Sequence, residues 1–146
     1  MEKESLLDQE KYIDVVNEVN TMYPQMHISS PLEYIEPDKY IPGMNSYEKR
    51  FANILQTRGL FVFREPIIDG LSHIPDFFVY NPRCIQGKLV ELTLYDSQFK
   101  RISADEKSIQ RKKRQIEEFR TCGIPFVAIY RENLEAIRSH CDMYLF

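Results

Sequence analysis

The chain has 146 residues, of which 43% are hydrophobic and 28% charged, and its formal net charge is −3. These values are typical of one folded domain and exclude an intrinsically disordered chain. No apolar run approaches the roughly 20 residues that span a bilayer, and the N-terminus lacks the pattern of a signal peptide, so we expect an intracellular (cytoplasmic) protein without a membrane partner.

Charge and composition divide the chain into two parts. Residues 1–45 hold nine acidic and three basic residues, a net charge of −6, whereas residues 46–146 have a net charge of +3. Apolar positions repeat at helical spacing over residues 4–21, and the four prolines of residues 22–45 indicate an irregular connection. We therefore expect an N-terminal helical appendage, 1–45, in front of a core, 46–146. The helix either packs on its own core or serves as a surface for a homodimer or a partner protein.

The core begins with a helix over 47–58, for which Ser46 is the expected N-cap and Gly59 the end. Aromatic and β-branched residues predict three strands next, over 61–66, 74–80 and 87–95. A charged helix, a buried strand, a short helix and a last strand follow, over about 104–121, 124–130, 132–139 and 142–146. This order predicts an α/β (α+β) fold with a mixed central sheet flanked by helices.

Three acidic residues stand out in the core. Glu48 lies on the first core helix, Asp76 opens the apolar part of the second strand, and Glu91 lies within the apolar third strand. A carboxylate in an apolar strand is costly unless it is paired or binds a cation, and two on neighbouring antiparallel strands can point to one place. Such oxygen ligands suit Mg²⁺ or Mn²⁺. The alternative is that each acid is a surface or capping residue.

A lysine interrupts the apolar face of the charged helix. Ile109, Lys112, Ile116 and Phe119 fall on one face at helical spacing. Lys112 either extends its ammonium to water or points it into the carboxylate site, where it can assist an attacking water or stabilise phosphate charge.

The same helix carries four further basic residues that make a positive surface: Lys107, Arg111, Lys113 and Arg114. Gln115 lies near the same face and is a further candidate for contact with phosphate. A solvated helix face is one interpretation of this pattern. Beside a metal site it also suits the phosphate backbone of a nucleic acid.

Pro75-Asp76, followed after fourteen residues by Glu91-Leu92-Thr93, resembles the motif of the PD-(D/E)XK nuclease superfamily. In that motif an aspartate begins one strand, and an acidic residue, a spacer and a lysine follow on the next. The sequence SYEKRFANIL (46–55) resembles the first core helix of the family, and IPDFFVY (74–80) its metal-binding strand in transposon-end-cleaving and very-short-patch-repair-like members. GIPFVAIY (123–130) is similar to its next buried strand.

The resemblance implies a restriction-endonuclease-like fold and a DNA endonuclease that acts in recombination, transposition, repair or phage DNA processing. It implies that Asp76 and Glu91 bind Mg²⁺, for which Mn²⁺ can substitute, that the backbone carbonyl of Leu92 is a further ligand, and that Glu48 completes the site.

Thr93 departs from the family pattern, because the motif has lysine there. We expect Lys112 to supply the missing charge, with Lys113 as the second candidate. Two other hypotheses stay open: a catalytically degenerate nuclease-fold subunit that binds DNA or a protein partner, and an accidental motif in which Asp76 and Glu91 do not converge. RNA also stays open as a substrate.

Overall fold

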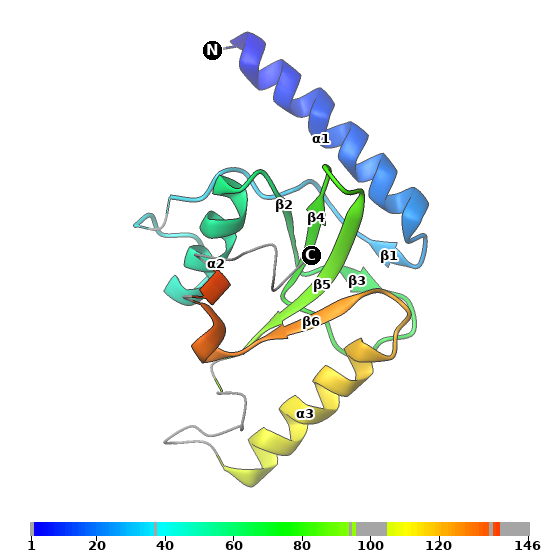
Figure 1. The fold of residues 1–146 in the computed structure, drawn as a ribbon, viewed down its shortest axis with the longest axis vertical. Coiled ribbons are helices and arrows are strands. Elements are labelled where there is room, and N and C mark those ends of the chain that lie inside the picture. Colours follow the sequence, from blue (N-terminus) through cyan, green and yellow to red (C-terminus); the bar gives the residue numbers. More distant parts are fainter. Residues whose placement is uncertain (1, 37, 94, 96–104, 135, 138–146) are drawn as a thin grey trace.

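The computed structural model describes residues 2–36, 38–93, 95, 105–134 and 136–137. In chain order its elements are α1 (Glu2–Met22), β1 (Met26–His27), α2 (Ser46–Thr57), β2 (Phe61–Arg64), β3 (Ile67–Ile68), β4 (Phe77–Asn81), β5 (Gln86–Leu92), α3 (Glu106–Arg120), β6 (Phe126–Ile129) and a 3₁₀ helix (Arg131–Asn133) (Figure 1). None of the described helices is both long and apolar enough to cross a bilayer.

A four-stranded sheet with the order β2-β4-β5-β6 forms the centre of the fold. The first three strands are antiparallel, whereas β6 runs parallel to β5. A parallel pair needs a long crossover connection, and α3 lies within it (Figure 1). The predicted α/β fold with a mixed sheet is therefore confirmed. A second small sheet pairs β1 with β3, two strands that the sequence analysis did not predict.

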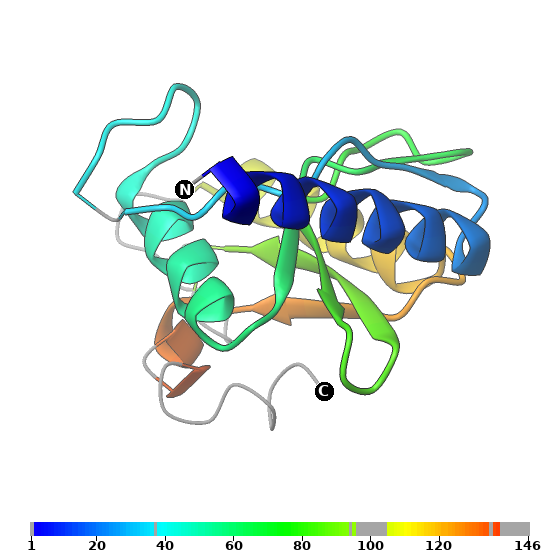
Figure 2. The same cartoon turned by 90° about the horizontal axis from the view of Figure 1, so that it is seen from above.

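Side chains cover both faces of the central sheet, because successive residues of a strand point to opposite sides. Phe77, Val79 and Val90 join the cluster that includes Phe51 and Leu55 of α2. Their neighbours Phe78 and Leu89 join the cluster on the opposite face, with residues of α1. Phe119 of α3 packs against Phe126 on that face too. The sheet thus lies between α1 and α3 on one side and α2 on the other (Figure 2).

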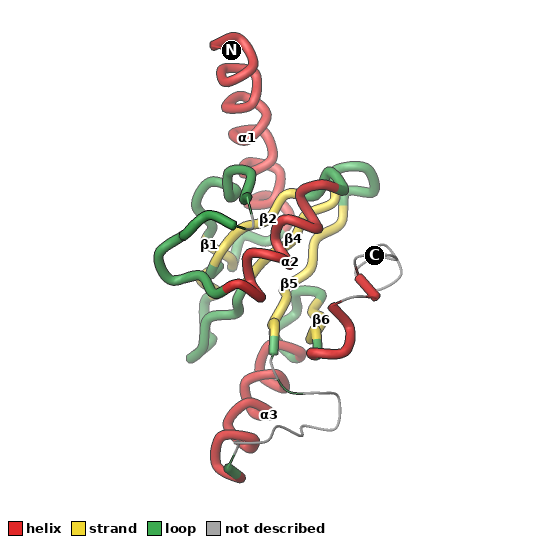
Figure 3. Tube along the Cα trace, turned by 90° about the vertical axis from the view of Figure 1, so that its left-hand side faces the viewer, coloured by secondary structure: helices red, strands yellow, loops and turns green. Residues whose placement is uncertain are grey.

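The C-terminal half of α1 packs on the protein's own core. Val15 and Val19 are buried in the same cluster as Phe63 and Phe78 of the sheet. The N-terminal end of α1 projects beyond the sheet, and α3 lies at the other end of the molecule (Figures 1 and 3). Packing on the core is therefore observed for these two valines, and a homodimer or partner protein on this helix stays a prediction.

The start of α2 corrects one prediction. The N-cap is Asn45, and the predicted cap Ser46 is the first residue of the helix. The Asn45 side chain accepts a hydrogen bond from the Glu48 N–H (2.8 Å), and Glu48 Oε1 accepts one from the Asn45 N–H (3.3 Å). This reciprocal capping box satisfies two N–H groups at the helix terminus. The helix ends as expected, with Gly59 at φ +80° after it.

The strands are shorter than predicted. β2 ends at Arg64, because Glu65 adopts a positive φ of 51° that breaks the extended run, and β5 ends at Leu92. The predicted helix over 132–139 begins as the 3₁₀ turn Arg131–Asn133. Residues 135, 138 and 139 of that helix and the predicted strand 142–146 lie outside the described residues.

Candidate active site

Asp76 and Glu91 converge at one end of the sheet. Phe77 of β4 pairs with Val90 of β5, so the next position along the antiparallel pair brings Asp76 opposite Glu91. The Asp76 N–H donates to Glu91 Oε1 (3.1 Å), and the Leu92 N–H donates to Asp76 Oδ2 (2.8 Å). The two carboxyl groups are therefore held together by backbone hydrogen bonds, in contrast to what an accidental motif predicts.

Lys112 reaches this pair of carboxyl groups from α3. Its Nζ lies 2.6 Å from Glu91 Oε2, and the side chains of Lys112 and Glu91 are 21% and 5% exposed. Ile116 and Phe119, one and two turns further along α3, are buried on the same face. The alternative in which Lys112 extends to water is therefore wrong, and its ammonium points into the carboxylate site.

The surroundings of Asp76 favour its neutral form. Burial, and next the negative charge of Glu91, raise the pKa of Asp76 to about 8, although the Leu92 N–H and the Lys112 ammonium act in the opposite direction. At neutral pH Asp76 therefore retains its proton.

A hollow of about 220 Å³ opens beside these groups, and it is lined by Asn45, Tyr47, Glu48, Asp76, Leu92, Thr93, Tyr95 and Lys112. Glu48 is thus brought to the site, but its carboxylate also caps α2 through the Asn45 N–H. Leu92 contributes its amide to Asp76, and the predicted role of its carbonyl as a metal ligand stays a prediction. The sequence analysis missed Asn45 and Tyr47, although both lie within three residues of Glu48.

Thr93 occupies the position where the motif has lysine, and there it stabilises the local backbone through hydrogen bonds. It is buried, its Oγ1 accepts the Tyr95 N–H (3.1 Å), and its own N–H donates to the Ile129 carbonyl (2.9 Å). These bonds fix the chain where β5 ends, and Lys112 is the ammonium group at this end of the sheet that contacts Glu91.

The carboxylate oxygens of the site can be compared with the ligands that a divalent cation usually has. Within the described ranges, no three His, Cys, Asp or Glu side chains come together as a metal-binding group. Mg²⁺ is usually bound through one or two carboxylates, with water and substrate phosphate as its other ligands. Asp76 and Glu91 fit this pattern, because they are two adjoining hard oxygen donors beside an open hollow.

Two further hollows lead from this site along α3. The first, of about 240 Å³, is lined by Tyr95, Ser108, Arg111, Lys112 and Gln115. The second, of about 420 Å³, is lined by Glu106, Lys107, Gln110, Arg111 and Arg114. The first shares Lys112 and Tyr95 with the hollow at Asp76, and Arg111 belongs to both hollows on α3. Of the predicted nucleic-acid-binding residues, Lys113 lines neither of them.

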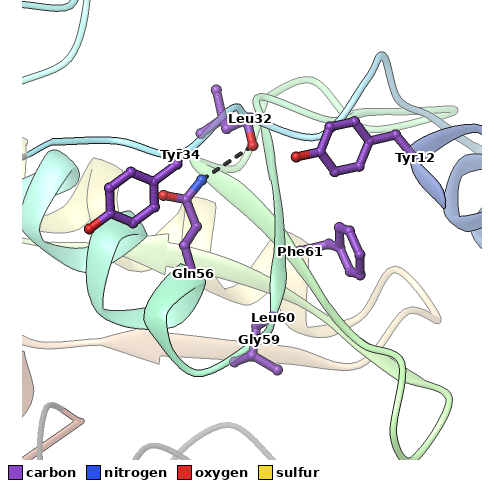
Figure 4. A pocket seen from close by; sticks show the side chains of 7 residues that line it. All are labelled: Tyr12, Leu32, Tyr34, Gln56, Gly59, Leu60 and Phe61. Atoms are coloured by element: carbon purple, nitrogen blue, oxygen red, sulfur yellow. Dashed lines mark hydrogen bonds between the residues drawn. The ribbon is translucent and has the colours of Figure 1, made fainter. Parts of the chain in front are cut away.

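A separate hollow of about 200 Å³ lies between α1, the end of α2 and β2, and it is lined by Tyr12, Leu32, Tyr34, Gln56, Gly59, Leu60 and Phe61 (Figure 4). It shares no residue with the site at Asp76, and none of its lining side chains is an acid, a histidine or a lysine. The Gln56 amide is engaged with the backbone of Leu32, Glu33 and Ile35, so this hollow holds no catalytic constellation.

Comparisons of the chain with protein-family models, with curated proteins and with solved structures gave no significant match.

Proposed function

We propose that this protein is a metal-dependent endonuclease of the PD-(D/E)XK type that hydrolyses phosphodiester bonds of DNA. The observation that carries the proposal is the group formed by the buried Glu91 with the half-buried Asp76 and Lys112, with contacts of 3.1 Å and 2.6 Å around Glu91. Such a group is costly for the fold, because buried charges need partners, and it gives no packing advantage over apolar residues. Perturbed carboxyl groups in a hollow are typical of functional sites.

The order of elements supports the proposed restriction-endonuclease-like fold. α2 precedes three antiparallel strands, and α3 then leads to β6, which is parallel to β5. This is the arrangement that the resemblance implies: a first core helix, the strands that carry the acids, a crossover helix and the next buried strand.

In the proposed reaction, Asp76 and Glu91 supply the carboxylate oxygens that hold Mg²⁺, or Mn²⁺ in its place. When bound, the cation lowers the pKa of a water and neutralises charge on the phosphate. Lys112 holds Glu91 in place through its 2.6 Å contact, and its positive charge stabilises the negative charge that develops on the phosphate. Glu48, on the rim of the hollow, accepts a proton from water or orients it.

The hollows along α3 support a polyanionic substrate. Lys107, Arg111 and Arg114 bring three positive charges next to the site, and Gln115 adds hydrogen-bonding capacity in the hollow that contains Lys112. Phosphates bound along α3 would leave the next one beside Asp76. Contacts of this kind give affinity that falls with salt and carries little sequence information.

Cleavage of supercoiled, linear and branched DNA at low salt, with Mg²⁺ or Mn²⁺, tests the proposal. Wild type should nick DNA in a metal-dependent manner, and Asp76→Asn should abolish nicking. Asp14→Asn, the same change at an exposed position of α1, is the matched control and should retain activity.

If the folded wild type cuts no DNA but binds it, the protein is the degenerate subunit, for which Thr93 is the main argument. If an RNA substrate is cut instead, the reaction stands and the proposed substrate does not.

A further inference from the structure

A second polar cluster joins the loop before β4 to α3. The Glu118 carboxylate accepts the Ser72 N–H (2.6 Å) and the Ser72 hydroxyl (3.0 Å), and it lies 2.8 Å from Nδ1 of His73. One carboxylate thus binds three donors from two consecutive residues. Hydrogen bonding from His73, and next from the Ser72 backbone, lowers the pKa of Glu118, so it is held as an anion.

The geometry of this cluster excludes a nucleophilic triad. Both the Ser72 hydroxyl (3.2 Å) and the Glu118 carboxylate (2.8 Å) approach the same ring nitrogen, Nδ1 of His73. In a triad the serine and the acid contact opposite nitrogens of the histidine. The contacts of Ser72 and His73 with Glu118 therefore hold two segments together and do not activate a hydroxyl.

The two segments that meet here are those that carry the candidate site. His73 precedes Asp76 by three residues, and Glu118 follows Lys112 on α3 by six. The same loop is tied at its start, where His27 Nε2 lies 2.9 Å from Asp69 Oδ1. At its end, Asp76 is bound to β5 through the Leu92 N–H.

We propose that Ser72, His73 and Glu118 form a positioning clasp that sets α3 against the strand end at Asp76 and so holds Lys112 on Glu91. The effect on catalysis rests on the proposed function, whereas the positioning of Lys112 on Glu91 does not. The clasp residues touch no substrate in this scheme, and they act through Lys112.

Such a device is useful because, among the described residues, the packing of α3 on the sheet beyond the Lys112–Glu91 contact is apolar. Ile116 and Phe119 bury its inner face, and apolar contacts are non-directional, so they tolerate small sliding and rotation. A slip of one residue moves a helix by about 1.5 Å, and a hydrogen bond of 2.6 Å between Lys112 and Glu91 does not survive that change. Directional bonds at Glu118 fix the axial position.

The clasp is tested first without any assay of activity, by the rate at which an amine-reactive reagent modifies Lys112. The measurement is made in a Lys113→Arg background, which removes the neighbouring amine, so that labelling at positions 112–113 comes from Lys112. Glu118→Gln should raise the rate about three- to fivefold, as loss of partly exposed hydrogen bonds to a carboxylate allows. Glu91→Gln, which removes the partner itself, sets the upper limit. Glu117→Gln, the same change at the exposed neighbouring residue, should leave the rate unchanged.

Variants of His73 separate positioning from general stability. The amide nitrogen of asparagine stands near the place of Nδ1, so His73→Asn should keep Lys112 protected, whereas His73→Ala should expose it. A purely structural role would lower the melting temperature in His73→Ala and leave labelling at 25 °C unchanged, and that result would overturn the clasp, as would an unchanged rate in Glu118→Gln.

If the protein cleaves DNA, Glu118→Gln should lower kcat and leave KM nearly unchanged, because the phosphate-binding residues of α3 remain. If no DNA is cut, the proposed function fails while the labelling result still decides the clasp.

Discussion

The carboxyl group of Asp76 binds a proton up to about pH 8, because it is buried beside Glu91. A divalent cation that binds Asp76, as proposed, must displace that proton, so the apparent affinity for Mn²⁺ should rise about tenfold per pH unit between pH 6 and 8 and level off above. Calorimetric titration at several pH values measures this. An affinity that is constant over this range would contradict the role of Asp76 as a ligand.

The same carboxyl group makes stability depend on pH. In the folded state the pKa of Asp76 is about 8, against a model value of 3.8, so the folded state retains the proton that the unfolded chain releases. The stabilisation is fully present below pH 3.8 and is lost as the pH rises to about 8. Asp76→Asn does not titrate, so its stability relative to wild type should grow by about 1.4 kcal/mol per pH unit in this window.

Chemical denaturation at pH 5, 7 and 9 checks this, and Asp14→Asn is again the matched control. A difference between Asp76→Asn and wild type that stays the same at all three values would show that Asp76 does not retain the proton.

In the proposed nuclease, Lys112 supplies the positive charge that the motif lysine would provide at the position of Thr93. Lys112→Ala should lower the cleavage rate by about 100-fold or more, the range of general acid–base and electrostatic effects. Adding Thr93→Lys to Lys112→Ala should restore part of the rate, because it returns an ammonium to the motif position. The restoration will be incomplete, since the Thr93 hydroxyl that binds the Tyr95 N–H is lost. Full activity in Lys112→Ala alone would refute the assignment.

At the scale of the elements, α2 depends on its cap. Asn45→Ala removes the oxygen that accepts the Glu48 N–H at 2.8 Å and should cost about 1 kcal/mol of unfolding free energy. Ser46→Ala, at the first helical position, should cost less, because alanine is a better helix former than serine there. Thermal unfolding compares the two variants. Equal losses of stability, or a larger loss for Ser46→Ala, would contradict the assignment of Asn45 as the N-cap and favour Ser46.

The sequence predicted the type of most elements because period and composition are local properties. The alternation through Val90, Glu91 and Leu92 predicted which side chains share a face, and the spacing from Lys112 to Phe119 placed the lysine on the apolar face of α3, with contact to the carboxylate site as one of two alternatives. Both patterns agree with the structure, because side chains that are buried against the sheet repeat with the period of the strand or helix that carries them. The strand pair β1–β3 was not predicted, because a strand of two residues is too short to show an alternating pattern.

The contacts that depend on tertiary placement were beyond local patterns. The cap of α2 is an exception, because Glu48 three residues after Asn45 is a local signal for a capping box, and the sequence analysis did not use it. Ser72 and Glu118 are 46 positions apart, and nothing in either neighbourhood marks them as partners. They meet because α3 crosses over the sheet and returns beside the loop before β4.

At the scale of the whole molecule, charge is separated along the long axis. The acidic helix α1 lies at one end and the basic helix α3 at the other (Figure 3). The proposed nucleic-acid substrate would therefore be attracted to the end that carries Lys112 and repelled from the end that carries the N-terminus. This polarity favours an approach of that substrate along α3 over an approach along α1.

The contribution of α1 to that fold can be measured at Val19, which is fully buried against the sheet. Val19→Ala removes two methyl groups from the core and should cost about 2 kcal/mol of unfolding free energy. Ile13→Ala is the matched control on the same helix, because Ile13 is 60% exposed, and its cost should stay within about 0.5 kcal/mol. Denaturant unfolding compares both variants with wild type. A loss at Ile13 equal to that at Val19 would mean that the exposed side of α1 is also covered in solution, as a homodimer or a partner protein on this helix requires.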